Sequence, residues 1–207
     1  MKLKKLSRSF YLRPTLTIAK DLLGKYFVRT YNGRRLVGKI VEVEAYLGER
    51  DPASHAYRGK TKRNEVMFWE GGHLYVYFTY GMHFCANVVT REKGIAEAVL
   101  IRAVEPMQGI EMMRKNRGEK WSTGVLEKWG NARTVDLTNG PAKFCKAFAI
   151  QRKHNGTNLL GDEIFIAEGT YISKSKIVAT TRIGIKNGME KKWRFYIKEN
   201  PCVSRKW

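Results

Sequence analysis

The sequence predicts an α+β protein of one domain, residues 1–207, whose main element is a mostly antiparallel β-sheet. The length suits a single domain, and a hydrophobic content of 43% is enough for a sizeable core. Asn32-Gly33 is a dipeptide typical of two-residue β-hairpin turns, and it separates two strand-like segments. Other segments rich in β-branched and aromatic residues predict further strands, whereas helical spacing is confined to short stretches.

The N-terminal part is expected to form a basic arm, a short helix and a β-hairpin. Residues 1–14 are basic and are followed by no apolar stretch, which indicates an N-terminal arm rather than a signal peptide. Thr17–Leu23 has apolar residues at helical spacing and ends before Gly24. Lys25–Tyr31 and Leu36–Leu47 are then expected to form the two strands of the hairpin.

The second strand of this hairpin carries two side chains of chemical interest on one face. Because side chains alternate along a strand, one face is wholly apolar and should pack on the core, namely that of Val41, Val43, Ala45 and Leu47. The other face carries Ile40, Glu42, Glu44 and Tyr46. Glu44 and Tyr46 therefore project from the same side, and Glu42 is expected to be solvated there.

The middle of the chain is expected to contain a long polar loop and a second β-hairpin. The loop, Gly48–Asn64, contains His55, and loops of this length are often functional. The aromatic and β-branched content of His73–Val89 predicts two strands. Tyr80-Gly81-Met82-His83 is expected at the hairpin tip, and one face of the first strand carries Tyr75, Tyr77 and Thr79.

The rest of the chain is expected to mix strands with short helices. Ala98–Ala103 predicts a strand that is apolar up to Arg102. A helix is expected after Glu105-Pro106, because proline suits the first helical turn, and another helix from Pro141. Residues 115–135 are basic and irregular and are expected to be mobile. Short strands are expected near 163–167, 176–183 and 193–198.

The charge of the chain predicts a polyanionic partner. The 39 Lys and Arg residues outnumber the 19 Asp and Glu residues, which gives a net charge of +20 and a pI near 10.0. Such an imbalance favours nucleic acid, with an anionic membrane surface as the second candidate and a merely soluble basic surface as the bland alternative. No stretch approaches the roughly 18 consecutive apolar residues of a membrane span, so no membrane insertion is expected.

The cysteines indicate a reducing environment and no metal site. Cys85, Cys145 and Cys202 are an odd number at wide spacings, and no CxxC or Cys/His zinc pattern is present. Free thiols in an intracellular compartment are the simplest interpretation. No phosphate-binding loop or cofactor motif is present either, so neither a metal nor a cofactor is expected.

Glu44 and Arg102 are the leading candidates for catalysis. A carboxylate beside an aromatic residue on the polar face of a core strand can act as a general base, although a solvated strand glutamate has the same pattern. Arg102 follows the apolar run Ala98–Ile101 and needs an anionic partner if it is buried, for which Glu44 is a candidate. The alternative is an arginine at a strand end whose head group reaches solvent.

A histidine and several tyrosines are the candidates for binding a nucleobase. His55 can stack on a ring and donate a hydrogen bond, or it can be an ordinary surface histidine. Tyr46 and Tyr77 can stack on bases, although strand tyrosines commonly pack in cores. Tyr80, at the expected hairpin tip, can act as a wedge between base steps. Chemistry on a base inside a duplex requires that the base be extruded into such an aromatic pocket.

Several segments, in order along most of residues 17–204, share the pattern of one known family. They are Ala19–Gly24, Ile40–Gly59, Thr61–Asn64, Met67–Phe68, His73–Val89, Val99–Pro106, Leu137–Ile150, Arg182–Ile185 and Trp193–Tyr196. In these segments the sequence resembles the alkyladenine (3-methyladenine) DNA glycosylase family of mammals and many bacteria. The resemblance implies a single catalytic domain with a curved antiparallel sheet, surrounding helices and a protruding β-hairpin that inserts into DNA.

The same resemblance implies an activity in DNA repair. It implies a monofunctional DNA glycosylase that flips alkylated or deaminated purines out of double-stranded DNA and hydrolyses their N-glycosidic bond. The substrates implied are 3-methyladenine, 7-methylguanine, hypoxanthine and ethenoadenine, and the product is an abasic site for base-excision repair. The protein is expected to act as a DNA-associated monomer inside the cell, without a cofactor.

Roles for individual residues also follow from the resemblance. Glu44 looks like the general base that activates water, and the further ligands of that water look like Arg102 and the main-chain carbonyl of Ile183. The flipped base would be held by Tyr46, His55 and Tyr77, with Asn87 obstructing a 2-amino group. Tyr80, with Met82 beside it, would intercalate in the gap. His83 and Cys202 depart from the pattern of some relatives, which affects the surroundings of the wedge and the C-terminal segment.

Two other functions fit the composition. A non-catalytic binder of DNA or RNA would explain the charge and the tyrosines, and a bifunctional glycosylase/lyase would use a lysine Schiff base. Burial discriminates between a binder and an enzyme. A binder would leave Glu44 solvated on a basic surface, whereas an enzyme would hold it in a pocket beside Arg102.

Overall fold

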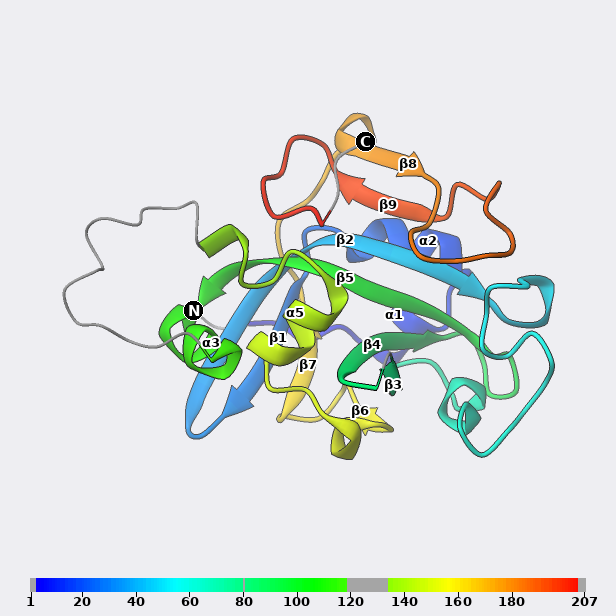
Figure 1. The fold of residues 1–207 in the computed structure, drawn as a ribbon, viewed down its shortest axis with the longest axis horizontal. Coiled ribbons are helices and arrows are strands. Elements are labelled where there is room, and N and C mark those ends of the chain that lie inside the picture. Colours follow the sequence, from blue (N-terminus) through cyan, green and yellow to red (C-terminus); the bar gives the residue numbers. More distant parts are fainter. Residues whose placement is uncertain (1–2, 80, 119–133, 205–207) are drawn as a thin grey trace.

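The computed structural model describes residues 3–79, 81–118 and 134–204 as one α+β domain built on a curled antiparallel sheet (Figure 1). The strands are β1 Tyr26–Tyr31, β2 Arg34–Leu47, β3 His73–Thr79, β4 His83–Thr90, β5 Glu97–Gln108, β6 Thr157–Asn158, β7 Ile164–Ala167, β8 Ile177–Thr180 and β9 Arg194–Ile197. Their order is β6-β3-β4-β5-β2-β1-β7, and β9 joins β2 to β8. The predicted fold class is therefore confirmed.

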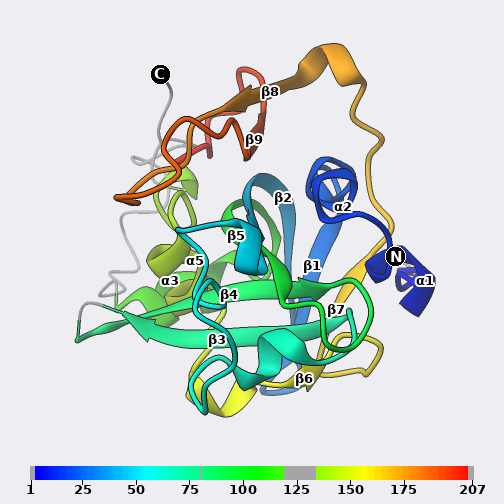
Figure 2. The same ribbon diagram turned by 90° about the vertical axis from the view of Figure 1, so that its right-hand side faces the viewer.

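Short helices surround this sheet. The α-helices are α1 Arg8–Tyr11, α2 Thr15–Leu22, α3 Ile110–Arg117 and α5 Pro141–Ala147, and the 3-10 turns are Gly48–Arg50, Glu65–Phe68, Arg152–His154 and Lys174–Lys176. Figure 2 shows α2 and α5 to either side of β2 and β5. The expected start of a helix at Pro141 is confirmed, whereas α2 begins two residues before the expected Thr17.

The first hairpin forms as the sequence predicts. Strands β1 and β2 pair up to Tyr31 and Arg34, which leaves Asn32-Gly33 as a two-residue turn. Both turn residues have positive φ, 48° and 70°, as a turn of type I′ requires. The turn therefore sets the register in which β2 runs back through the centre of the sheet.

Strand β2 lies in the middle of the sheet and is buried on both of its faces from Ile40 to Ala45. Strand β5 pairs with one edge, while β1 and β9 share the other. The apolar face packs on the core as expected. The expectation that Glu42 is solvated is wrong, because Arg102, Arg194 and the C-terminal segment at Ser204 cover that face.

The helix expected after Glu105-Pro106 forms, but the expected place of Pro106 in its first turn is wrong. Strand β5 continues through Pro106 to Gln108, and α3 begins only at Ile110, after Gly109 at φ 79°. Pro106 lies opposite Gly38 at a register shift of the β2–β5 ladder, where a missing N–H is tolerated. Residues 115–117, expected to be irregular, form the last turn of α3, and Gly118 ends that helix, whereas residues 119–133 lie outside the described residues.

The main core joins the sheet to α2, α5 and the expected N-terminal arm. Phe27 packs edge-to-face on Phe144 and Phe148, with ring centroids 5.0 and 5.5 Å apart. Leu6 and Tyr11 from the expected arm are buried in the same cluster. Within the described part of the chain, no helix is long and apolar enough to cross a membrane.

Gly38 should be a position where the core tolerates no added atom. A Cβ there would lie 2.6 Å from Val104 Cγ2 and 3.0 Å from Phe148 Cζ, between β5 and the end of α5. We expect Gly38→Ala to lower the free energy of unfolding by about 1–3 kcal/mol, in the range of overpacked cores. Urea unfolding measures the change. Gly140→Ala is the control, because its Cβ would meet only the side chain of Lys143, at 3.9 Å, and a loss as large in this variant would contradict the overpacking argument.

Candidate functional site

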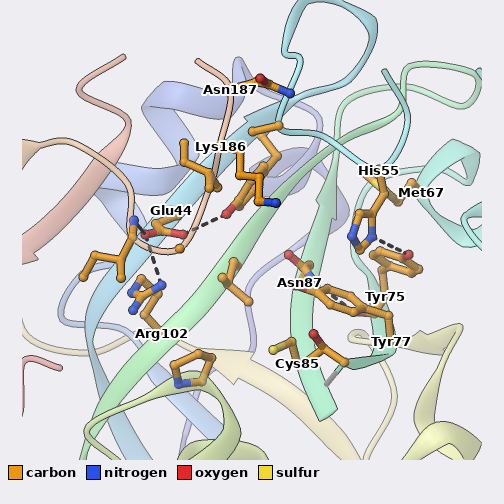
Figure 3. Close-up of a pocket in the computed structure, with 18 of the residues that line it drawn as sticks. Glu44, His55, Met67, Tyr75, Tyr77, Cys85, Asn87, Arg102, Lys186 and Asn187 are labelled. Carbon is orange, nitrogen blue, oxygen red and sulfur yellow. Dashed lines mark hydrogen bonds and ion pairs between the residues drawn. The ribbon is translucent and has the colours of Figure 1, made fainter. Parts of the chain in front are cut away.

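A pocket of about 530 Å³ opens where β2, β3, β4 and β5 meet two loops (Figure 3). The first loop contains His55, and the second contains Ile183 and Lys186. Seven of the residues singled out in the sequence line it together: Glu44, Tyr46, His55, Tyr77, Asn87, Arg102 and Ile183. Met82 lies elsewhere, 70% exposed at the end of the second hairpin, and Tyr80 lies outside the described residues.

Glu44 lies at the floor of this pocket and is fully buried. The Tyr46 hydroxyl donates to its Oε2 over 2.9 Å, and the main-chain N–H of Ile183 donates to its Oε1 over 2.8 Å. Nη1 of Arg102 lies 3.1 Å from the same Oε1. Three donors from three parts of the chain therefore hold the carboxylate in one orientation.

Arg102 is buried and links two carboxylates. In addition to Glu44 it binds Glu42, whose Oε1 accepts a hydrogen bond from Arg102 Nε at 3.0 Å. Burial lowers the pKa of Arg102, but the negative charges of Glu44 and Glu42 outweigh burial and raise it overall. The expected pairing of Arg102 with Glu44 is therefore confirmed, and the alternative of a solvent-reaching arginine is not.

Glu42 is the residue whose surroundings the sequence analysis misjudged. It is fully buried, and its Oε1 accepts from Arg194 Nε at 2.7 Å as well as from Arg102. Ser204 contributes two more hydrogen bonds, from its main-chain N–H at 2.7 Å and from its hydroxyl at 2.9 Å. The strand pattern contained no signal for these contacts, because Arg194 and Ser204 are far away in the sequence.

Tyrosine and histidine side chains form the wall opposite Glu44. Nδ1 of His55 is 3.0 Å from the Tyr75 hydroxyl, and the ring centroids of His55 and Tyr77 are 4.5 Å apart. Burial, and secondly the positive charge of Arg63, lowers the pKa of His55, so the imidazole is neutral at neutral pH. Burial raises the pKa of Tyr75 to about 12. Tyr75 was not named as a site residue, although alternation places it on the face of Tyr77.

Asn87 completes this wall from β4. It pairs with Tyr75 in the β3–β4 ladder, and its Nδ2 donates to the Tyr75 carbonyl over 3.3 Å. Cys85, two residues earlier, also lines the pocket. Burial raises the pKa of its thiol. All three cysteines are free, as the sequence predicted, and the structure shows that they are buried.

A buried ion pair behind Tyr46 holds the two loops together. Nη2 of Arg182 lies 2.8 Å from Oδ1 of Asp51, and its Nη1 donates to the Ala45 carbonyl over 3.0 Å. The guanidinium also stacks on the rings of Tyr46, at 4.7 Å, and Trp193, at 5.1 Å. This pair brings the loop of Ile183 onto Glu44. Sequence analysis missed it, although Arg182 opens one of the segments shared with the known family.

The geometry fits hydrolysis beside a flat aromatic ligand. The volume suits a small planar molecule, and the aromatic walls can stack on its faces. A buried carboxylate beside a guanidinium is typical of a group that orients and deprotonates water. Among the described residues, no group of His, Cys, Asp and Glu side chains could hold a metal ion.

Comparison with known proteins gives one consistent match. The profile of the methylpurine-DNA glycosylase family matches residues 9–201. A protein of Carboxydothermus hydrogenoformans is 54% identical over 202 residues, which cover 97% of this chain and 99% of that protein. Relatives in Clostridium acetobutylicum and Chlorobium phaeobacteroides are 50% and 48% identical, with at least 97% of each chain covered. All three carry the provisional name 3-methyladenine DNA glycosylase.

The Arg182–Asp51 pair should be a main source of stability for the site. Both side chains are fully buried, and removing one partner leaves the other charge unpaired. We expect Asp51→Asn to lower the free energy of unfolding by about 3 kcal/mol or more, measured by chemical denaturation. Asp162→Asn is the control, because Asp162 pairs with Lys5 while fully exposed to solvent. The free energy of unfolding should stay unchanged there, and a similar value for both variants would disprove the importance of the buried pair.

Proposed function

The chain belongs to the methylpurine-DNA glycosylase family, and we propose that it removes damaged purines from double-stranded DNA by hydrolysing the N-glycosidic bond. The names of its relatives support 3-methyladenine as a substrate. We extend the proposal to 7-methylguanine, hypoxanthine and ethenoadenine, and to an abasic site as the product. The observation that carries the proposal is the buried Glu44 carboxylate, bound to Arg102 inside a pocket with aromatic walls.

In the proposed mechanism, Glu44 activates the attacking water. The bond between the sugar and the base breaks and the base leaves with its electron pair, while the water oxygen bonds to the anomeric carbon of the sugar and the carboxylate accepts the proton of that water. The negative charge of Glu44 offsets the positive charge that develops on the sugar as the bond breaks. Arg102 and the main-chain carbonyl of Ile183 are the proposed further ligands of this water. The hydrogen bonds from Tyr46 and the Ile183 N–H support this assignment, because they fix the orientation that a general base needs.

The flipped purine is proposed to bind between Tyr46 on one side and His55 with Tyr77 on the other. An alkylated purine that carries positive charge is attracted to the faces of tyrosine rings. A neutral His55 supports this proposal, because an imidazolium would repel such a ligand. Asn87, also in the pocket wall, is proposed to exclude purines with a 2-amino group.

Access to the base is proposed to depend on the second hairpin and on charge. Tyr80 would fill the gap that the flipped base leaves, and Met82 beside it is exposed enough to contact DNA. The net charge of +20 supports binding to the DNA backbone. We propose that a monomer without a cofactor suffices, because one pocket engages one lesion.

Glu44→Gln should abolish most excision. Glutamine keeps the shape and an acceptor but cannot take a proton from water, so single-turnover release of 3-methyladenine should fall by about 100-fold or more. Affinity for lesion DNA should persist or rise, because an anion beside the phosphates is removed. Near-normal excision would overturn the role of Glu44 as the base.

The control for this variant is Glu97→Gln. Glu97 is a buried glutamate on β5 that binds Arg50 and Thr15 and is absent from the pocket lining, so its variant should keep the excision rate. Loss of lesion binding by Glu44→Gln would instead make Glu44 a structural partner of Arg102. Trapping a covalent adduct with borohydride would favour a lysine nucleophile, for which Lys186 in the pocket lining is the candidate.

Tyr80→Ala should weaken lesion binding and turnover without affecting the fold. Loss of one stack between a base and an aromatic ring typically costs about 1–3 kcal/mol, so affinity for lesion duplexes should fall about 5- to 150-fold. Fluorescence anisotropy measures the affinity, and thermal melting checks the fold. Tyr57→Ala, which removes an exposed tyrosine outside the hairpin, is the comparison. Equal affinities of Tyr80→Ala and the unmodified protein would show that Tyr80 is no wedge.

A further inference from the structure

We propose that Glu42 is a positioning residue of this enzyme, acting on Glu44 through Arg102 and held in place by Ser204 near the C-terminus. This inference rests on the proposed function. Glu42 is absent from the side chains that line the pocket in the described part of the chain, so it acts without touching the substrate. Its effect reaches the reaction through the orientation of Arg102 and through the charge around Glu44.

The orientation of Arg102 depends on two carboxylates that bind different nitrogens. Glu42 accepts from Nε at 3.0 Å, and Glu44 lies 3.1 Å from Nη1. Because the guanidinium is planar, fixing two of its nitrogens fixes the direction of the whole group. Glu42 therefore aims Arg102 at the pocket floor. Without it, the guanidinium would keep its contact with Glu44 and a longer one, 3.3 Å, with the Ser204 hydroxyl, but its Nε would lose the carboxylate that it binds.

The backbone supports the same arrangement. The β2–β5 ladder shifts register between Ile40 and Glu42 and again between Glu42 and Val43. In this ladder Glu42 pairs with Ala103 and Val43 with Ile101, so Arg102 is left as an extra residue between two pairs. Bulges of this kind redirect a side chain and recur next to active sites. The bulge lets Arg102 reach both carboxylates of β2.

The C-terminal segment closes this cluster on the side away from the pocket. Ser204 donates to Glu42 from its main chain at 2.7 Å and from its hydroxyl at 2.9 Å, and its hydroxyl is 3.3 Å from Nη2 of Arg102. Arg194 on β9 approaches Glu42 from the other edge of β2. The cluster thus excludes water and joins the end of the chain to the pocket floor.

Within the described residues, the charges of this cluster balance. Two carboxylates, Glu42 and Glu44, face two guanidinium groups, Arg102 and Arg194, in one buried network. Among the described residues, the other polar or charged groups facing Glu44 are the Tyr46 hydroxyl, the Ile183 N–H, Arg182, Tyr77 on β3 and Cys85 on β4. Removing the charge of Glu42 leaves an excess cation beside Glu44, which favours the anion of Glu44 and weakens it as a base. Removing the charge of Arg194 should have the opposite effect and make Glu44 a stronger base.

The test compares the pH profiles of excision in Glu42→Gln and Arg194→Gln. Single-turnover release of 3-methyladenine from methylated duplex DNA is measured across the acidic limb, with spontaneous release subtracted. The limb should move to lower pH in Glu42→Gln and to higher pH in Arg194→Gln, by about one pH unit each. The plateau rate of Glu42→Gln should fall on the order of 10-fold, because Arg102 is held less firmly.

Glu97→Gln is the matched control, since Glu97 is also a buried, ion-paired glutamate but lies outside the cluster. It should lower the melting temperature without moving the profile. If Glu42→Gln does not fold, the expected shift of the pH profile of Arg194→Gln to higher pH is the test. Wild-type protein that releases no base would overturn the proposed function and this inference together. Wild-type release, with profiles of the folded variants that superimpose on it, would overturn the inference alone.

Discussion

The contact of Arg102 with Glu42 and Glu44 is the interaction on which the rest of the site depends. A guanidinium and two carboxylates out of reach of solvent are stable only when they satisfy one another, since each unpaired charge would cost several kcal/mol. Strand β2 supplies the two carboxylates, and β5 supplies the arginine. The bulge between these strands sets the direction of the arginine side chain. The N–H of Ile183, Arg194 and Ser204 then complete the cluster from three remote parts of the chain.

The sheet and the loops have different tasks in this arrangement. The sheet carries the groups whose position must be rigid, Glu44, Tyr46, Tyr77, Asn87 and Arg102, on strands that the core fixes from behind. The loops supply His55 and Ile183, which lie on segments of less regular structure. The buried pair of Arg182 and Asp51 joins these two loops to each other and to the back of Tyr46, so contacts within the protein hold the pocket walls in place.

Local patterns predicted the elements that local forces determine. Asn32-Gly33 predicted the hairpin, alternating apolar residues predicted the core face of β2, and Pro141 predicted the start of α5. The two clear errors have a common cause. Pro106 is typical of a helix start and Glu42 of a solvated strand, but pairing with Gly38 and burial beneath Ser204 override those preferences. Neither partner is near in the sequence, so no periodicity could indicate it.

The fold class, the family and the pocket residues within the family's characteristic segments could all be predicted from the sequence. Propensity and turn chemistry depend on a few neighbouring residues, and net charge depends on the whole composition. Neither requires knowledge of the tertiary structure. Only the tertiary structure shows that Glu42 is buried, that Arg182 binds Asp51 and that Ser204 lies against β2. These contacts join residues more than a hundred positions apart, and the strong interaction of opposite charges away from water stabilises them.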